Sequence, residues 1–85
     1  MQQVILFGTD GCHLCEMALE LVREAQNLIL LSVEEVDIAQ DAALVERYGI
    51  RIPVVMREGR ELNWPFDHGA LMEFLTSAPE QEHTQ

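Results

Sequence analysis

The two cysteines of this chain, Cys12 and Cys15, are separated by two residues and follow closely after an apolar run. The run Val4–Phe7, bounded by Gly8, is typical of a strand that is buried on both faces. Beyond it, apolar residues recur at helical spacing and predict a helix over about Cys12–Gln26. The sequence therefore predicts a buried strand, a short turn, and a helix that begins at the cysteines.

Three further strands are predicted along the chain. Residues 28–38 form a second strand region, whose hydrophobic alternation breaks at Glu34–Glu35 and leaves its register open. A third strand is expected over 50–56 and a short fourth strand over 62–64, with a turn at 58–60 between them. Because only a turn separates the last two strands, we expect them to form a hairpin.

Two further helices are predicted. The first is short, over residues 41–48, and Gly49 stands where a left-handed residue commonly ends a helix. Its expected inward residues are Leu44, Val45 and Tyr48. Asp67 is placed to cap the second of these helices at its N-terminus. The apolar stripe of that helix consists of Leu71, Phe74 and Leu75.

The element order is therefore β-α-β-α-β-β-α, which indicates an α/β fold with four strands. A strand–helix–strand start favours a parallel pair with a right-handed crossover, and the hairpin makes the sheet mixed. Helices on both faces of the sheet are the natural packing. The 85 residues, 48% of them apolar, are expected to form one domain over 1–78, followed by a polar, flexible tail at 79–85.

The charge balance is acidic, with 15 Asp and Glu, five Arg and no Lys, for a formal charge of −10. Phosphate contacts need a basic face, so nucleic acid and anionic membranes are poor partners. Two cysteines are too few for a disulfide-stapled secreted scaffold, and the N-terminal run is too short for a signal peptide. We therefore expect a cytoplasmic protein in which any disulfide is transient.

The predicted position of the cysteines suggests thiol chemistry. At the first turn of a helix, unpaired backbone N–H groups and the helix dipole favour a thiolate on Cys12. Cys15, one turn later on the same side, can close a disulfide with it, so Cys12 is expected to be the nucleophile and Cys15 the resolving thiol. His13 as an imidazolium would stabilise the thiolate further, whereas a nearby Asp10 carboxylate would oppose it.

These residues resemble those of glutaredoxins, within the thioredoxin superfamily. The resemblance covers Val4 to about Leu75 and rests on "VILFGTDGCHLC", "ERYGIRIPVV" and the element order. It implies sheet order 2-1-3-4, attack by Cys12 and resolution by Cys15. It also implies a cis bond before Pro53, although base rates favour trans.

The resemblance further implies which residues meet the substrate. Ile52 and Val54 would flank the bound thiol substrate beside Pro53, and Asp67 would take the acidic position that helps to hold glutathione. No metal or organic cofactor is implied for the protein itself. The partners would be a protein or small-molecule disulfide and an external reductant, either glutathione or a thioredoxin-reductase-like flavoprotein, and the chain would act as a monomer.

Two other functions stay open at this stage. Cys12, His13 and Cys15, with His68 or His83, offer soft ligands for a metal ion or an iron–sulfur cluster, although zinc normally takes four protein ligands. Alternatively, the chain could be an interaction module of this fold without redox activity.

Overall fold

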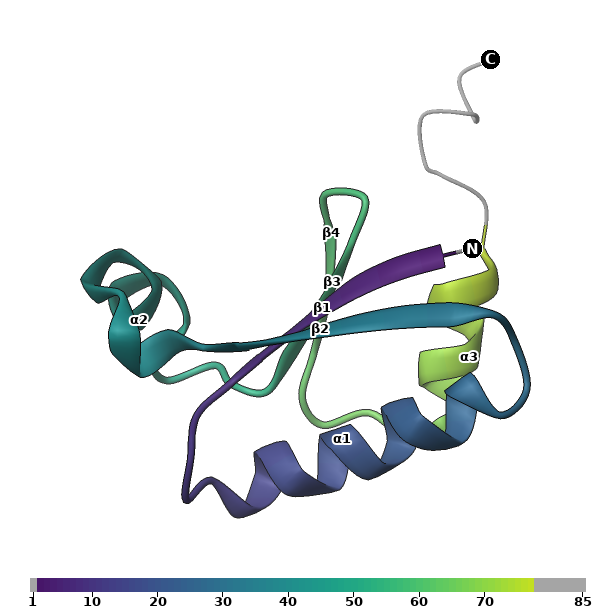
Figure 1. Ribbon diagram of the computed structural model, residues 1–85, viewed down its shortest axis with the longest axis horizontal. Helices are drawn as coiled ribbons and strands as arrows, with labels where there is room; N and C mark the ends of the chain where they lie inside the picture. Colours follow the sequence, from purple (N-terminus) through teal and green to yellow (C-terminus); the bar gives the residue numbers. More distant parts are fainter. Residues whose placement is uncertain (1, 78–85) are drawn as a thin grey trace.

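The computed structural model describes residues 2–77, which form a four-stranded sheet with helices around it (Figure 1). The predicted tail at 79–85, and His83 within it, lie outside the described residues. In chain order the elements are β1 (Gln2–Gly8), α1 (His13–Gln26), β2 (Leu31–Asp37), the 3-10 helix η1 (Ile38–Gln40), α2 (Ala42–Tyr48), β3 (Val54–Arg57), β4 (Arg60–Asn63) and α3 (His68–Thr76).

The strands are ordered β2-β1-β3-β4, so the sheet order that the resemblance implies is confirmed. β1 and β2 are parallel, and the register pairs Gly8 with Asp37. The β1–β3 pair is antiparallel, with Phe7 opposite Val54, and β3–β4 is the predicted antiparallel hairpin. The first strand therefore lies inside the sheet, and its C-terminal end leads directly into the cysteine turn.

The two faces of the sheet have separate hydrophobic cores. Figure 1 shows α1 and α3 together on one side of the strands. α1 and α3 cover one face, where Leu6 packs with Ala18, Val22, Leu71 and Leu75. α2 covers part of the other face, where Phe7 packs with Ile38, Tyr48 and Val54. Adjacent residues of β1 point to opposite faces, which explains why its sequence is continuously apolar.

The Asp67 side chain caps α3, as the sequence predicts. The Asp67 carboxylate accepts a hydrogen bond of 2.8 Å from the Ala70 N–H at the start of α3. In the hairpin turn, Glu58 and Gly59 have φ angles of 53° and 81°. Positive φ at both central residues gives the turn a backbone twist that matches the right-handed twist of the two strands.

All four predicted strands differ from the structure at their ends. β1 covers Gln2–Gly8, two residues more at its start and one more at its end than the predicted run. Residues 28–30 lie outside β2, because the Leu28 N–H donates to the Ala25 carbonyl and continues the turn at the end of α1. Ile38 begins η1, because the Asp37 carboxylate accepts from the Ala39 N–H and closes a tight turn there. β3 is confined to 54–57, with residues 50–53 forming part of the connection from α2. β4 covers Arg60–Asn63, so Arg60 belongs to the strand and not to the turn, and Trp64 lies outside the strand.

Two expectations for α2 are wrong. Gly49 has φ −53°, so it is right-handed helical, and its N–H donates to the Val45 carbonyl. A Cβ at this position would lie 2.5 Å from that carbonyl oxygen, so close approach, not a left-handed conformation, explains the glycine. Val45 is 44% exposed, because the helix turns it away from the core that Tyr48 enters.

Candidate functional site

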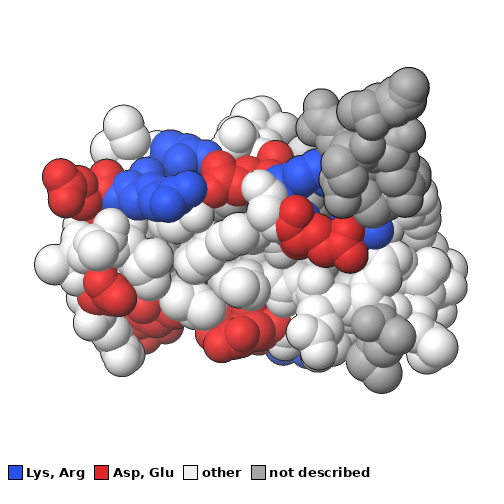
Figure 2. Space-filling model, turned by 90° about the horizontal axis from the view of Figure 1, so that it is seen from above, with Lys and Arg blue, Asp and Glu red and all other residues white. Residues whose placement is uncertain are grey.

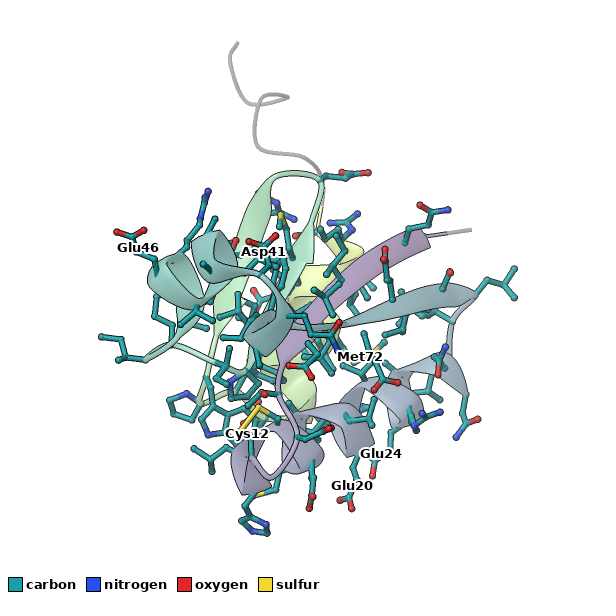
Figure 3. All side chains as sticks on the ribbon, turned by 60° about the vertical axis from the view of Figure 1, so that its left-hand side comes forward. Cys12, Glu20, Glu24, Asp41, Glu46 and Met72 are labelled. Carbon is teal, nitrogen blue, oxygen red and sulfur yellow. A yellow bond between two sulfur atoms is a disulfide. The ribbon has the colours of Figure 1, made fainter. Side chains whose placement is uncertain are left out.

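Cys12 and Cys15 are joined by a disulfide at the start of α1, with their Cα atoms 5.2 Å apart. Cys12 is the N-cap residue of the helix and has an extended backbone, whereas Cys15 lies in the first turn. Figure 3 shows the disulfide at the end of the molecule where β1 passes into α1. The predicted position of the pair at a helix N-terminus is therefore confirmed.

The two sulfur atoms have different surroundings. Cys12 is partly exposed, and its Sγ accepts a hydrogen bond of 3.1 Å from the Cys15 N–H. Cys15 is 9% exposed and belongs to the buried residues of α1. An N–H donor and the positive end of the helix dipole both stabilise negative charge on the Cys12 sulfur. The geometry thus favours a reactive thiolate at Cys12 and a sheltered thiol at Cys15.

Gly8, the last residue of β1, lies against the buried cysteine. A Cβ on Gly8 would come within 3.1 Å of the Cys15 Sγ and 3.2 Å of its Cβ. Contacts this short are rare for real side chains, so any larger residue at this position would displace Cys15 or the strand. The glycine therefore makes the close approach of the cysteine to the sheet possible.

The two residues predicted to tune the thiolate are both exposed. The His13 side chain is 82% exposed, and its Nδ1 lies 4.0 Å from the Glu16 carboxylate one turn along α1. Asp10 is exposed in the turn between β1 and α1. In this arrangement His13 is paired with Glu16, and the Cys12 sulfur accepts its hydrogen bond from the backbone of Cys15.

The residues predicted to meet the substrate lie at the same end of the sheet as the cysteines. Val54 pairs with Phe7 in β1, and the Ile52–Pro53 peptide bond before it is cis. Pro53 is buried and Ile52 is partly buried. Asn63 in turn pairs with Val54, so the segment that leads to Asp67 starts from this same end.

That segment packs as an apolar entrance to α3. The Trp64 and Phe66 rings meet edge to face with their centroids 4.9 Å apart, and Phe66 is 7% exposed within the core. The Asp67 carboxylate is already engaged as the cap of α3. A substrate group that contacted Asp67 would therefore share it with the Ala70 N–H.

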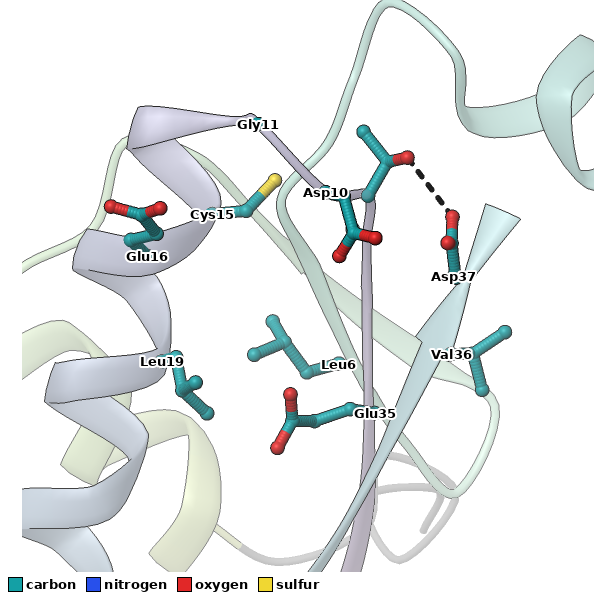
Figure 4. A pocket seen from close by; sticks show the side chains of 11 residues that line it. Leu6, Asp10, Gly11, Cys15, Glu16, Leu19, Glu35, Val36 and Asp37 are labelled. Atoms are coloured by element: carbon teal, nitrogen blue, oxygen red, sulfur yellow. Dashed lines mark hydrogen bonds between the residues drawn. The ribbon is translucent and has the colours of Figure 1, made fainter. Parts of the chain in front are cut away.

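A cavity of about 390 Å³ opens beside Cys15, between α1 and the β1–β2 pair. Leu6 and Leu19 line it on the apolar side, and the Asp10 and Glu35 carboxylates point toward the same space in Figure 4. Asp37 also lines it and accepts a hydrogen bond of 2.9 Å from the Thr9 hydroxyl. The remaining lining residues are Gly8, Thr9, Gly11, Glu16 and Val36.

Sequence reasoning missed the part of this cavity that β2 contributes. Glu35 and Asp37 are far from the cysteines in sequence, and only the parallel pairing of β1 with β2 brings them alongside. The available signal was the acidic residue at the end of a strand expected to pair with the first one. Without a register, that signal could not assign Glu35 to one face of the sheet.

A second polar cluster lies away from the cysteines, between α2 and β4. The Tyr48 hydroxyl donates to the Glu61 carboxylate at 2.8 Å, and the Arg51 guanidinium donates to the other carboxylate oxygen at 2.5 Å. The hydrogen bonds from Arg51 and Tyr48 lower the pKa of Glu61. Burial raises the pKa of Tyr48, and its bond to Glu61 raises it further. This cluster ties α2 to the hairpin.

Across residues 2–77, no three His, Cys, Asp or Glu side chains are grouped closely enough to hold a metal ion. His68, one of the ligands considered above, lies 3.8 Å from the Glu24 carboxylate of α1. Within the same residues, none of the helices combines the length and the apolar character needed to cross a membrane.

The chain matches the family model of the Glutaredoxin-like domain (DUF836) over residues 3–76. The structure is similar to the crystal structure of protein XcR50 from X. campestris, with 42% identity, a TM-score of 0.81, and coverage of 89% of this chain and 99% of that one. Protein Ne2328 from Nitrosomonas europaea is similar at 27% identity and TM-score 0.75, covering 88% and 92%.

A mutant thioredoxin from Halobacterium salinarum is similar at 26% identity and TM-score 0.63, covering 91% of this chain and 76% of that one. No curated protein matches the chain. The strand order, the position of the cysteine pair and these similarities agree with one another. The chain belongs to the glutaredoxin-like domain family DUF836 and has a thioredoxin-like fold.

Proposed function

We propose that this protein is a dithiol–disulfide oxidoreductase. The Cys12 thiolate attacks a substrate disulfide, so a new S–S bond forms at Cys12, and the substrate bond breaks to release a thiolate that takes up a proton. Cys15 then loses its proton and attacks the Cys12 sulfur, which releases the second substrate thiol. Two electrons pass to the substrate, and the protein is left with the Cys12–Cys15 disulfide seen in the structure.

The observation that supports this function best is the difference between the two cysteines. The partly exposed sulfur of Cys12 accepts the Cys15 N–H at the N-terminus of a 14-residue helix, whereas Cys15 is buried. Such a donor and dipole stabilise a thiolate, and attack on an external disulfide requires exposure. Cys12 has both features, and Cys15 is placed to attack Cys12 alone.

The remaining roles extend this proposal. We assign substrate contact to Ile52, Pro53 and Val54, with Asp67 nearby, and re-reduction to glutathione or a thioredoxin-reductase-like flavoprotein. A protein with this cycle would act as a cytoplasmic monomer without a resident metal or organic cofactor. Phosphate contacts need an unbroken basic face, but the basic groups in Figure 2 lie beside acidic groups. Arg51, for example, is paired with Glu61.

The first test is the redox equilibrium of the cysteine pair. Metal-free protein is equilibrated in graded dithiol buffers, alkylated, and weighed by mass spectrometry. We expect a reversible two-electron transition within the range of roughly −200 to −270 mV that spans glutaredoxins and thioredoxin. A disulfide that no cellular reductant opens, or a pair that never forms one, would contradict the proposed function.

The second test assigns the two roles. A Cys15→Ser variant keeps the attacking thiol and should accumulate a mixed disulfide with a small neutral disulfide, visible as a mass increase. A Cys12→Ser variant leaves only the buried thiol of Cys15, and we expect no such adduct on the same timescale. Trapping on Cys12→Ser but not on Cys15→Ser would reverse the roles.

A further inference from the structure

The cavity beside Cys15 combines an apolar floor with an acidic rim. Leu6 and Leu19 form the floor, and the acidic residues that line the cavity are Asp10, Glu16, Glu35 and Asp37 (Figure 4). No arginine is among the residues that line it. A ligand that fits such a space has a short aliphatic stem and a positively charged head, because methylene groups pack on leucine and a cation pairs with carboxylates.

The cavity is also within reach of a substrate that is bonded to Cys12. Asp10 and Gly11 line it and immediately precede Cys12 in the chain, so its rim lies within two residues of the attacking sulfur. It lies on the β2 side of β1, whereas Pro53 precedes β3 on the other side. A substrate held beside Pro53 could therefore extend a neighbouring group across the cysteine turn into the cavity.

The nearest cation leaves this space available. Arg23 lies 3.4 Å from the Glu35 carboxylate, but both side chains are more than half exposed, so the pair is weak and easily exchanged. His13 lies at the outer side of α1, 4.0 Å from Glu16. Neither residue lines the cavity, and a substrate ammonium can replace Arg23 at Glu35 without leaving a buried charge unpaired.

We propose, on the basis of the function above, that this cavity is a specificity site for disulfides with a cationic group a few bonds from the reacting sulfur. The group is a primary ammonium or a guanidinium, as in an aminoalkyl disulfide or beside a cysteine in a basic peptide. The same rim disfavours an anionic disulfide, because its carboxylates would face Asp10 and Glu35.

The test compares two disulfides of matched length. The pre-reduced protein is mixed with cystamine, a dication, or with neutral bis(2-hydroxyethyl) disulfide, and the reaction is quenched with acid and followed by mass. Each rate is divided by that of dithiothreitol with the same disulfide, which removes the intrinsic reactivity of the substrate. We expect a normalised preference of about fivefold for cystamine at low ionic strength, falling toward one in about 0.5 M salt.

A matched pair of variants separates the cavity from the overall charge. Asp10→Asn with Glu35→Gln should lower the normalised preference toward one. The preference is the ratio of the cystamine rate to the neutral-disulfide rate in the same variant, so a change in the reactivity of Cys12 cancels. Glu20→Gln with Glu46→Gln removes the same two charges from exposed positions that do not line the cavity, and should keep the preference. Figure 3 shows Glu20 and Glu46 on separate helices, away from Cys12.

A second arm distinguishes the source of the cation. Cysteine disulfides of two short peptides, identical except for Lys or Gln beside the cysteine, are compared in the same way. A preference in either arm that the cavity variant removes supports the proposal. A normalised preference of one in both arms, an equal loss in both double variants, or a preference that the cavity variant keeps would overturn it. If even the neutral disulfide fails to react, the proposed function fails, which is a separate outcome.

Discussion

Replacing Glu61 by Gln should lower the free energy of unfolding, because Glu61 belongs to the hydrogen-bonded cluster between α2 and the hairpin. The Glu61 carboxylate accepts from Tyr48 at 2.8 Å and from Arg51 at 2.5 Å, and its side chain is 21% exposed. A hydrogen bond to a charged group contributes roughly 1.5–3 kcal/mol. Gln keeps one acceptor but turns an NH₂ group toward a second donor. We therefore expect a loss of about 2 kcal/mol near neutral pH, after partial solvent exposure is allowed for.

The pH dependence of this loss follows from the pKa of Glu61. The bonds from Arg51 and Tyr48 lower that pKa below its ordinary value of 4.5, so the folded state favours the carboxylate. The resulting stability is fully present above about 4.5 and is lost as the pH falls through the lower, folded-state pKa. The difference in unfolding free energy between the wild type and Glu61→Gln should therefore become smaller as the pH falls below the folded-state pKa of Glu61.

Urea unfolding of both proteins, near neutral pH and again at about pH 3, measures the two free energies directly. Glu46→Gln on the exposed side of α2 is the control, because it removes the same charge outside the cluster and should change stability by less than about 0.5 kcal/mol. In a domain of this size the expected loss corresponds to a fall in Tm of roughly 8–16 °C. A difference that is equal at both pH values, or no larger than that of the control, would refute the reasoning.

Three further outcomes are expected. Tyr48 is the only tyrosine, so the ultraviolet absorbance of tyrosinate should show a titration midpoint above 10 in the folded protein and near 10 in urea; equal midpoints would contradict its burial and its bond to Glu61. Gly8→Ala should lower the free energy of unfolding by about 1–3 kcal/mol, because its Cβ crowds Cys15. Gly69→Ala in α3 is the control, because its Cβ meets only an ordinary contact, and it should stabilise the protein by about 0.5–1 kcal/mol. Thermal melts compare the two variants, and equal effects would argue against the close contact at Gly8. Asp67→Ala should lose about 1 kcal/mol and Asp67→Asn much less, since only alanine removes the acceptor that caps α3; equal losses in urea would count against the cap.

The parts of the fold that the sequence predicts well are those with local signals. The apolar run of β1, the stripe of α1 and the cap at Asp67 each depend on residues within one element, and all three are confirmed. The prediction of a left-handed Gly49 is wrong because a glycine after a helix has two explanations, a left-handed conformation or a close approach to another atom. The sequence pattern alone does not separate them. The Tyr48–Glu61 bond joins two residues that are 13 positions apart in the chain, so it depends on how α2 packs over the hairpin.

The chemistry of the cavity depends on one feature that the sequence left open, the register of β2. Phe7 pairs with Val36 and Gly8 with Asp37, so Glu35 and Asp37 face the cavity, while Glu34 lies on the other side of the sheet. A shift by one residue would exchange the two faces of the strand. Asp37 opposes such a shift, because its carboxylate accepts both from the Thr9 hydroxyl and from the Ala39 N–H at 2.9 Å. The residue that ends β2 therefore also holds the turn that precedes the cysteines, which couples the acidic rim to the placement of the disulfide.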